Sequence, residues 1–130
     1  DKGICVLHTI GSILPPQPNA PFIQRYIFPD GEIPHESDMA KNIEKSGLIM
    51  SDRETLIRHY DKTLEAWLKR FLKNKHIVKD LFDQKFVKMW EFYLASCSAA
   101  FKYRDLVVFQ YQLVKNFDAI PSNRRDYIYS

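Results

Sequence analysis

The stretch ICVLHTIG, residues 4–11, decides the fold class of this 130-residue chain. It begins with a continuous apolar run over residues 4–7, which is typical of a strand buried on both faces of a parallel sheet. A strand of this kind needs a neighbour on each edge. Only two other segments have a strand pattern, residues 48–51 and residues 107–115, so the sequence predicts an incomplete sheet.

Apolar residues that recur at three- and four-residue spacing predict two long helices. The stripes are Tyr60, Leu64, Trp67, Leu68 and Phe71 in the first helix, and Phe86, Met89, Trp90, Tyr93, Leu94 and Cys97 in the second. Core packing is the simplest role for both stripes. Asp83 is the expected N-cap of the second helix, and a shorter helix is expected over residues 38–45, between an N-cap at Asp38 and a stop at Gly47.

The segments between the expected strands predict helix or loop, and the first of them must be an irregular connection. Residues 12–21 are Pro-rich, and residues 22–28 form a short aromatic segment that the turn signal Pro29-Asp30-Gly31 closes. Three strands and about four helices are too few for a complete doubly wound sheet. We therefore expect residues 1–130 to form a single partial domain of the α/β class, rich in helix.

The composition is that of a globular protein. Hydrophobic residues make up 45% of the chain and charged residues 27%, which argues against disorder, and the aromatic share of 14% permits an apolar pocket. The formal net charge of +3 comes from basic residues spread along the helices. Nucleic acid is therefore not an expected partner, whereas a faint preference for anionic lipid is compatible with this charge.

Cysteine usage and hydropathy exclude further classes. Cys5 and Cys97 form no CxxC pair and have no nearby His cluster, so neither a metal site nor a disulfide framework is expected. No apolar run approaches the ~20 residues of a membrane span. Because the opening residues show no signal-peptide pattern, we expect a cytoplasmic location of the bacterial type.

His8 is the first candidate site residue. It directly follows the apolar run, and the carboxyl ends of strands form the ligand crevice of open α/β sheets. A histidine there can exchange a proton near neutral pH or orient an anion, although it can equally satisfy a loop carbonyl. His59 is expected to be an exposed capping residue, and Arg124-Arg125-Asp126 a solvated tail.

Several chemistries leave no trace in the sequence. There is no Ser nucleophile elbow and no HExxH motif. The glycines are isolated from one another, so no Gly-rich phosphate or cofactor loop is present; they are Gly3, Gly11, Gly31 and Gly47. From the residues alone, the prediction is an incomplete α/β enzyme with a site at His8 and no stated substrate.

Five segments together resemble the C-terminal part of the cyclopropane-fatty-acyl-phospholipid synthase family of S-adenosylmethionine-dependent methyltransferases. They are LHTIG at 7–11, FIQRYIFPDGEIP at 22–34, HYDKTLEAW at 59–67, MWEFYLASCSAAF at 89–101 and VFQ at 108–110. The resemblance implies a Rossmann-like class I methyltransferase fold whose cofactor-binding Gly-rich loop precedes Asp1. The chain would then hold no cofactor-binding residues and would be inactive alone.

The resemblance also implies the reaction. In this family a methyl group passes from the sulfonium of S-adenosylmethionine to the cis double bond of an unsaturated phospholipid acyl chain. A cationic intermediate then loses a proton to a bound bicarbonate ion and closes to a cyclopropane. A site of this kind needs an anion held close and dry, without a strong nucleophile that would trap the cation. The implied place of action is the inner surface of the membrane, where the enzyme would be peripheral.

Residue roles follow from the same resemblance. His8 would hydrogen-bond bicarbonate, the backbone of Ile10 would add a donor, and Tyr60 would bind the ion through its hydroxyl; a Cys and a Glu from the upstream part would complete the site. The segment from Tyr26 to Phe28 would border the acyl channel, or serve only as a packing loop. Cys97 corresponds to a cysteine to which a catalytic role is given in the family. Its position on an apolar helical stripe with no base beside it instead predicts an inert thiol.

Two alternatives remain open at this point. The chain could come from a family methyltransferase that acts on another lipid or a small amine, or it could be a non-catalytic module that binds lipid or a partner. In each case the unpaired edge of the sheet predicts association with the missing half or self-association into a homo-oligomer.

Overall fold

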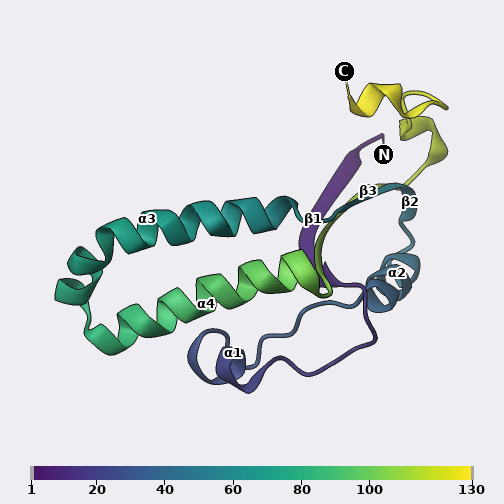
Figure 1. Cartoon of the computed structure of the whole chain (residues 1–130). Helices are drawn as coiled ribbons and strands as arrows, with labels where there is room; N and C mark the ends of the chain where they lie inside the picture. Colours follow the sequence, from purple (N-terminus) through teal and green to yellow (C-terminus); the bar gives the residue numbers. More distant parts are fainter. Residues whose placement is uncertain (1, 130) are drawn as a thin grey trace.

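The sheet of the computed structural model, which describes residues 2–129, has three strands: β1 (Ile4–Ser12), β2 (Ile49–Leu56) and β3 (Leu106–Val114). The strand order is β1-β3-β2, so the last strand along the chain lies in the centre of the sheet. It runs antiparallel to both neighbours, and the three strands lie beside one end of the two long helices (Figure 1). Its sequence LVVFQYQLV is rich in β-branched and aromatic residues, and Phe109 at its middle is fully buried.

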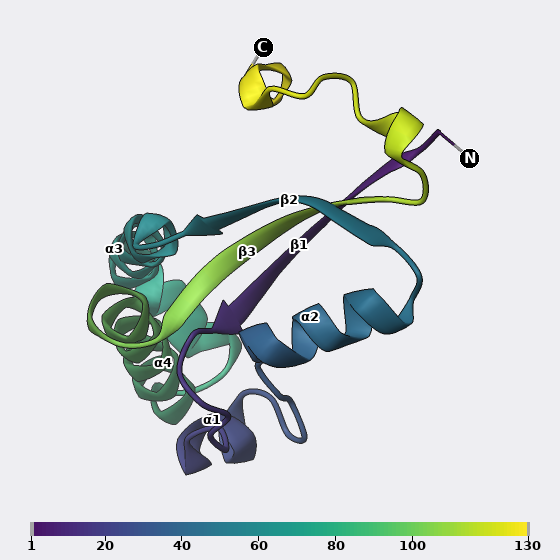
Figure 2. The ribbon, with the colours of Figure 1, turned by 90° about the vertical axis from the view of Figure 1, so that its right-hand side faces the viewer.

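Helices pack against both faces of the sheet, on one of them only at its end. The side chains of β3 alternate: Val107, Phe109 and Tyr111 join a core cluster with Ile43 of α2 (Glu36–Lys45). Val108 joins the other cluster, with residues of α3 (His59–Leu81) and α4 (Gln84–Tyr103). Figure 2 shows α2 along one side of the sheet and the α3–α4 pair gathered at its end.

The two long helices form an antiparallel hairpin that projects from the sheet (Figure 1). The predicted N-cap of α4 is confirmed, because Asp83 Oδ1 accepts a hydrogen bond of 2.6 Å from the backbone N–H of Phe86. The short helix α1 (Pro21–Tyr26) lies against α4, where the rings of Phe22 and Phe92 meet edge to face at 4.8 Å. Two 3₁₀ turns, Phe117–Ala119 and Arg125–Ile128, complete the described chain.

The expected start of α2 was wrong by one turn. His35 is the N-cap, since its Nδ1 accepts from the backbone N–H of Ser37 at 3.2 Å, and Asp38 lies inside the first turn. There its negative charge still favours the positive end of the helix. The stop at Gly47 is as expected: its φ of +73° is the left-handed conformation in which helices commonly end.

The fold class is confirmed as a helix-rich α/β fold with an open three-stranded sheet, but the pairing expected for its first strand was wrong. Strand β1 pairs antiparallel with β3, and among the described residues its other edge makes only an isolated bridge between Ser12 and His35. As an edge strand it is not buried on both faces, and Val6 is 63% exposed. The strand also runs through residue 12, so His8 lies inside it and not after its end.

Candidate functional site

A row of three polar side chains crosses the sheet at His8. The register places His8 of β1 beside Gln110 of β3, and Gln110 beside Glu54 of β2. His8 Nδ1 lies 3.1 Å from Gln110 Oε1, and Gln110 Nε2 donates to Glu54 Oε2 at 3.3 Å. The amide oxygen that faces the histidine favours the neutral tautomer in which Nδ1 is the donor. The row therefore leaves Nε2 of the exposed imidazole as an acceptor for a ligand.

The backbone N–H of Ile10 points to the open edge of the sheet. The ladder between β1 and β3 continues at Ile13, whose N–H donates to the carbonyl of Asp105 at 3.2 Å. In an antiparallel pair every second residue faces the partner strand, so the N–H groups of Gly11 and Thr9 do so as well, and those of Ile10 and His8 face away. The N–H of Ser12 confirms this direction, because it donates to Pro34 on that side.

Tyr60 lies in the first turn of α3, on the sheet face that also carries His8. Its ring packs 5.1 Å from Phe101 and 6.0 Å from Trp67, and both Tyr60 and Ile10 contact the buried cluster around Val108. His59 is exposed, as expected, and its Nδ1 lies 2.9 Å from the Ile57 carbonyl. The N-cap position itself belongs to Arg58, in a left-handed conformation with φ of 63°.

A buried carboxylate fixes this end of α3 to α4. Asp61 is only 6% exposed, and Oδ1 accepts a hydrogen bond of 2.5 Å from the Ser98 hydroxyl. Lys102 Nζ lies 3.9 Å from Oδ2 and 3.3 Å from Glu65 Oε1. Since buried carboxylates are found where they are paired, this contact orients the helix turn that carries Tyr60.

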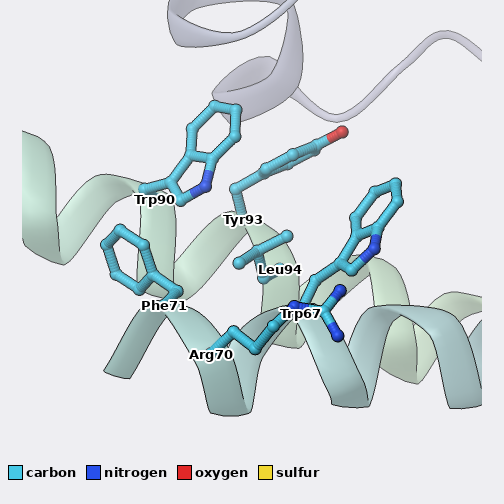
Figure 3. Close-up of a pocket in the computed structure, with 6 residues that line it drawn as sticks. All are labelled: Trp67, Arg70, Phe71, Trp90, Tyr93 and Leu94. Atoms are coloured by element: carbon cyan, nitrogen blue, oxygen red, sulfur yellow. The ribbon is translucent and has the colours of Figure 1, made fainter. Parts of the chain in front are cut away.

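Between α3 and α4 lies a pocket of about 390 Å³ (Figure 3). It is lined by Trp67, Arg70, Phe71, Trp90, Tyr93 and Leu94. Most of these residues belong to the two stripes whose expected role was core packing. The stripes carry more aromatic surface than the helix pair buries, and Trp67 remains 42% exposed.

Of the predicted channel residues, Tyr26 ends α1 and Phe28 follows it, and Phe28 contacts a wall of this pocket. The Phe28 ring meets Tyr93 edge to face at 6.3 Å, and Tyr26 contacts Phe22 at 5.7 Å. Both side chains also reach solvent, at 46% exposed for Tyr26 and 56% for Phe28. Contact with α4 and exposure together suit either a channel wall or a packing loop.

Cys97 is half-buried on α4, where burial raises the pKa of its thiol, and a hydrogen bond from Tyr93 only partly offsets this. Burial also raises the pKa of Tyr93 to about 12, and the adjacent Cys97 adds to the shift. Both groups are thus held in their neutral forms. In residues 2–129 no three His, Cys, Asp or Glu side chains come together as a metal site requires.

The segment at Arg125 is not the solvated tail that the sequence predicted. Arg125 makes a bidentate ion pair with Asp52 of β2, with Nε–Oδ2 at 2.5 Å and Nη2–Oδ1 at 2.8 Å. Gln112 Nε2 donates to the Tyr127 hydroxyl at 2.6 Å. The chain thereby folds back over the polar end of the sheet. No helix among the described residues is long and apolar enough to cross a bilayer.

Comparisons with known proteins identify the family. The sequence model of the mycolic acid cyclopropane synthetase family matches residues 1–111. The cyclopropane-fatty-acyl-phospholipid synthase of Escherichia coli K12 is 37% identical over 109 residues, which cover 84% of this chain and 28% of that protein. A probable fatty acid methyltransferase of Pseudomonas putida is 41% identical over 81 residues, 62% of this chain and 21% of that protein.

Solved structures agree on the fold. The cyclopropane synthase MmaA2 from Mycobacterium tuberculosis superposes with a TM-score of 0.78 at 24% identity, covering 85% of this chain and 44% of that one. The mycolic acid cyclopropane synthase CmaA1, complexed with SAH and CTAB, gives a TM-score of 0.77 at 26% identity over the same shares. The chain belongs to the mycolic acid cyclopropane synthetase family of S-adenosylmethionine-dependent methyltransferases. It spans about a quarter of the length of the E. coli relative, at 28%.

Proposed function

We propose that this chain is the C-terminal portion of an enzyme that forms cyclopropane fatty acids. The enzyme would transfer a methylene group from S-adenosylmethionine to the cis double bond of unsaturated phospholipid acyl chains. The observation that carries this proposal is the 37% identity to the E. coli cyclopropane-fatty-acyl-phospholipid synthase over 84% of the chain. When bound, S-adenosylmethionine would supply the methyl group, and bicarbonate would take the proton that the acyl chain loses on ring closure.

The residues around His8 fit a small oxyanion. The N–H of Ile10 offers one donor at the open edge of β1, and His8 Nε2 offers an acceptor for a hydroxyl of the ion. Tyr60 adds a phenol from the same sheet face. Together the three groups would hold the ion, with its remaining ligands and the whole cofactor site contributed by the part of the enzyme outside this chain.

Phe28 and Tyr26 would border the path of the acyl chain. The support is their position: Phe28 packs on Tyr93, which also lines the aromatic pocket between α3 and α4. Cys97 has no step to perform in this reaction, because a nucleophile near a carbocation would trap it. Its neutral thiol is compatible with that requirement.

The enzyme would work as a peripheral protein on the cytoplasmic side of the inner membrane. The open edge of β1 would pair with a strand from the rest of the enzyme or from a second copy, because unpaired strand edges are templates for pairing. Size-exclusion chromatography of the chain tests this pairing. A stable monomer whose amides at residues 4–7 are fully protected from exchange would contradict it.

The catalytic proposal is tested with the full-length enzyme and methyl-labelled S-adenosylmethionine. Label should enter unsaturated phospholipid and not its saturated counterpart. Removing bicarbonate should lower the rate by at least ~100-fold, the usual contribution of a proton-transfer group, and His8→Ala should lower it in the same way because it removes a ligand of this ion. Cys97→Ser is the matched control and should keep most of the activity.

Other outcomes identify the rivals. Label in a small amine or a different lipid, with none in unsaturated phospholipid, would replace the substrate assignment. A full-length protein that turns over nothing, while this chain binds liposomes equally with and without His8→Ala, would favour the non-catalytic module.

A further inference from the structure

The far end of the α3–α4 hairpin combines exposed apolar side chains with a high density of positive charge. We call residues 69–88 the hairpin tip. The turn between the helices exposes Leu81 at 72% and Phe82 at 63%, and Ile77 on the preceding turn is 49% exposed. Figure 1 shows that this end of the hairpin is the part farthest from the sheet.

The hairpin tip holds more positive charge than the whole chain has in excess. It contains seven Lys or Arg residues and two acidic residues, Asp80 and Asp83, while the formal net charge of the chain is +3. Asp83 is already engaged as the N-cap of α4. None of the seven cations forms an ion pair among the residues that the structure describes; they are Lys69, Arg70, Lys73, Lys75, Lys79, Lys85 and Lys88.

An aromatic row leads from this tip into the pocket. The rings of Phe82 and Phe86 stack at 4.3 Å, Phe86 and Trp90 stack at 5.8 Å, and Trp90 meets Tyr93 at 5.1 Å. Trp90 and Tyr93 are also walls of the pocket in Figure 3. A continuous apolar surface therefore joins the exposed turn to the cavity.

The exposed apolar side chains and the unpaired cations of the hairpin tip indicate the kind of partner that it fits. Burial of the tip against another protein surface would desolvate its unpaired cations, which is costly unless each meets a carboxylate. An anionic bilayer accepts both parts at once, because its interior takes Leu81 and Phe82 while its headgroups attract the surrounding lysines. We propose that the hairpin tip docks on the surface of an anionic phospholipid bilayer and that the aromatic row leads an acyl chain from it into the pocket. This inference rests on the proposed phospholipid substrate.

Sedimentation of the chain with vesicles tests the docking without any turnover. Binding is expected with vesicles that contain phosphatidylglycerol, weaker in high salt, and absent with pure phosphatidylcholine. Lys75→Glu with Lys79→Glu should weaken binding at least ~25-fold, since each basic residue near such a surface contributes about fivefold. Leu81→Ser with Phe82→Ser should also weaken it by at least ~10-fold.

Matched controls lie far from the tip. Lys41→Glu with Lys45→Glu removes two exposed lysines of α2, and Phe117→Ser removes a ring that is 74% exposed. Both control variants should bind like the wild type. Equal binding of the tip variants and the wild type, or loss of binding in the controls alone, would overturn the docking proposal.

Turnover by the full-length enzyme separates this inference from the proposed function. Tip variants should lose activity on vesicles and retain it on phospholipid dispersed in detergent micelles. If the wild type turns over neither substrate but the chain still binds vesicles through its tip, the proposed reaction fails and the docking stands. If tip variants act on vesicles as fast as the wild type, the docking is refuted while the reaction stands.

Discussion

Gly11→Ala should destabilise the protein strongly, because there is no room for a methyl group at this position. A Cβ at residue 11 would lie 2.6 Å from Cδ2 of Phe109, overlap Cε2 of the same ring, and lie 3.0 Å from the carbonyl oxygen of Pro34. Real Cβ atoms do not approach other atoms so closely. Phe109 is fully buried in the central strand, so the ring has no free space into which to move.

The expected loss is about 3 kcal/mol, at the upper end for an added methyl group in a packed core. In a domain of this size it corresponds to a fall in Tm of roughly 10 °C. Urea denaturation followed by circular dichroism measures the loss, with Gly3→Ala as the control, since a Cβ at Gly3 meets nothing within 4 Å. The control should change stability by less than ~0.5 kcal/mol.

A second background isolates the cause. Phe109→Leu removes the ring carbons that Cβ would meet, so Gly11→Ala should cost less than ~1 kcal/mol in that background. If Gly11→Ala costs less than ~0.5 kcal/mol in the wild type, or the same in both backgrounds, the packing argument is wrong. Confirmation would explain the glycine of the LHTIG segment by its close packing on the Phe109 ring, one residue beyond Ile10 of the proposed oxyanion site.

Three further perturbations test other contacts. Asp61→Ala and Ser98→Ala should each cost about 2 kcal/mol of unfolding free energy, with a coupling near 1 kcal/mol in a double-mutant cycle. As a control, substitution of the exposed Glu65 by Ala should be nearly neutral. Additive losses in the cycle would contradict the pairing of Asp61 with Ser98. Burial raises the pKa of the Cys97 thiol, so this thiol should react with an aromatic disulfide reagent at pH 8 at least ~10-fold more slowly than the exposed Cys5. The Cys5→Ser and Cys97→Ser variants allow each thiol to be measured alone. Equal rates would show that Cys97 is an activated thiol. Burial raises the pKa of Tyr93 from its ordinary 10.0 to about 12 in the folded state, so its contribution to the unfolding free energy is complete below pH 10 and is lost as the pH rises toward 12. Tyr93→Phe should therefore reduce the fall in unfolding free energy between pH 10 and pH 12. An unchanged slope would refute the shift.

The periodic patterns in the sequence predicted the long helices and the strands, but they did not predict how the strands pair. The alternation of side chains along residues 107–115 correctly predicted the two faces of β3, because successive side chains of a strand point to opposite faces of the sheet. The apolar run at residues 4–7 indicated a strand but could not reveal its direction. Apolar character reports burial, whereas parallel or antiparallel pairing depends on connections far along the chain.

Most of the candidate site was not predicted from the sequence, because polar residues obscured the strand pattern of β2. Asp52, Arg53 and Glu54 made β2 read as a loop after residue 51, yet their side chains pair with Arg125, Glu36 and Gln110 across the fold. Glu54 and Gln110 are 56 residues apart, so no local pattern could have joined them to His8. The sequence signal for this row was weak: His8 and Gln110 are polar residues within two largely apolar strands.

The exposed aromatic pocket was missed for a related reason. Periodicity assigned both helical stripes to the core, and it was right for Leu64 and Leu94, which are 3% and 2% exposed. The stripes continue along the projecting hairpin, where the sheet no longer covers them and a few side chains such as Phe28 pack on them instead. A sequence pattern shows which face of a helix is apolar but not how far along the helix its cover extends.

The central claim is tested most directly by lipid mass spectrometry of cells that express the full-length enzyme, beside cells that express its His8→Ala variant. Unsaturated phospholipids should gain one methylene with the wild type, and the His8 variant should lose this gain while remaining folded. Unchanged phospholipids, in cells whose enzyme is folded and binds S-adenosylmethionine, would contradict the account.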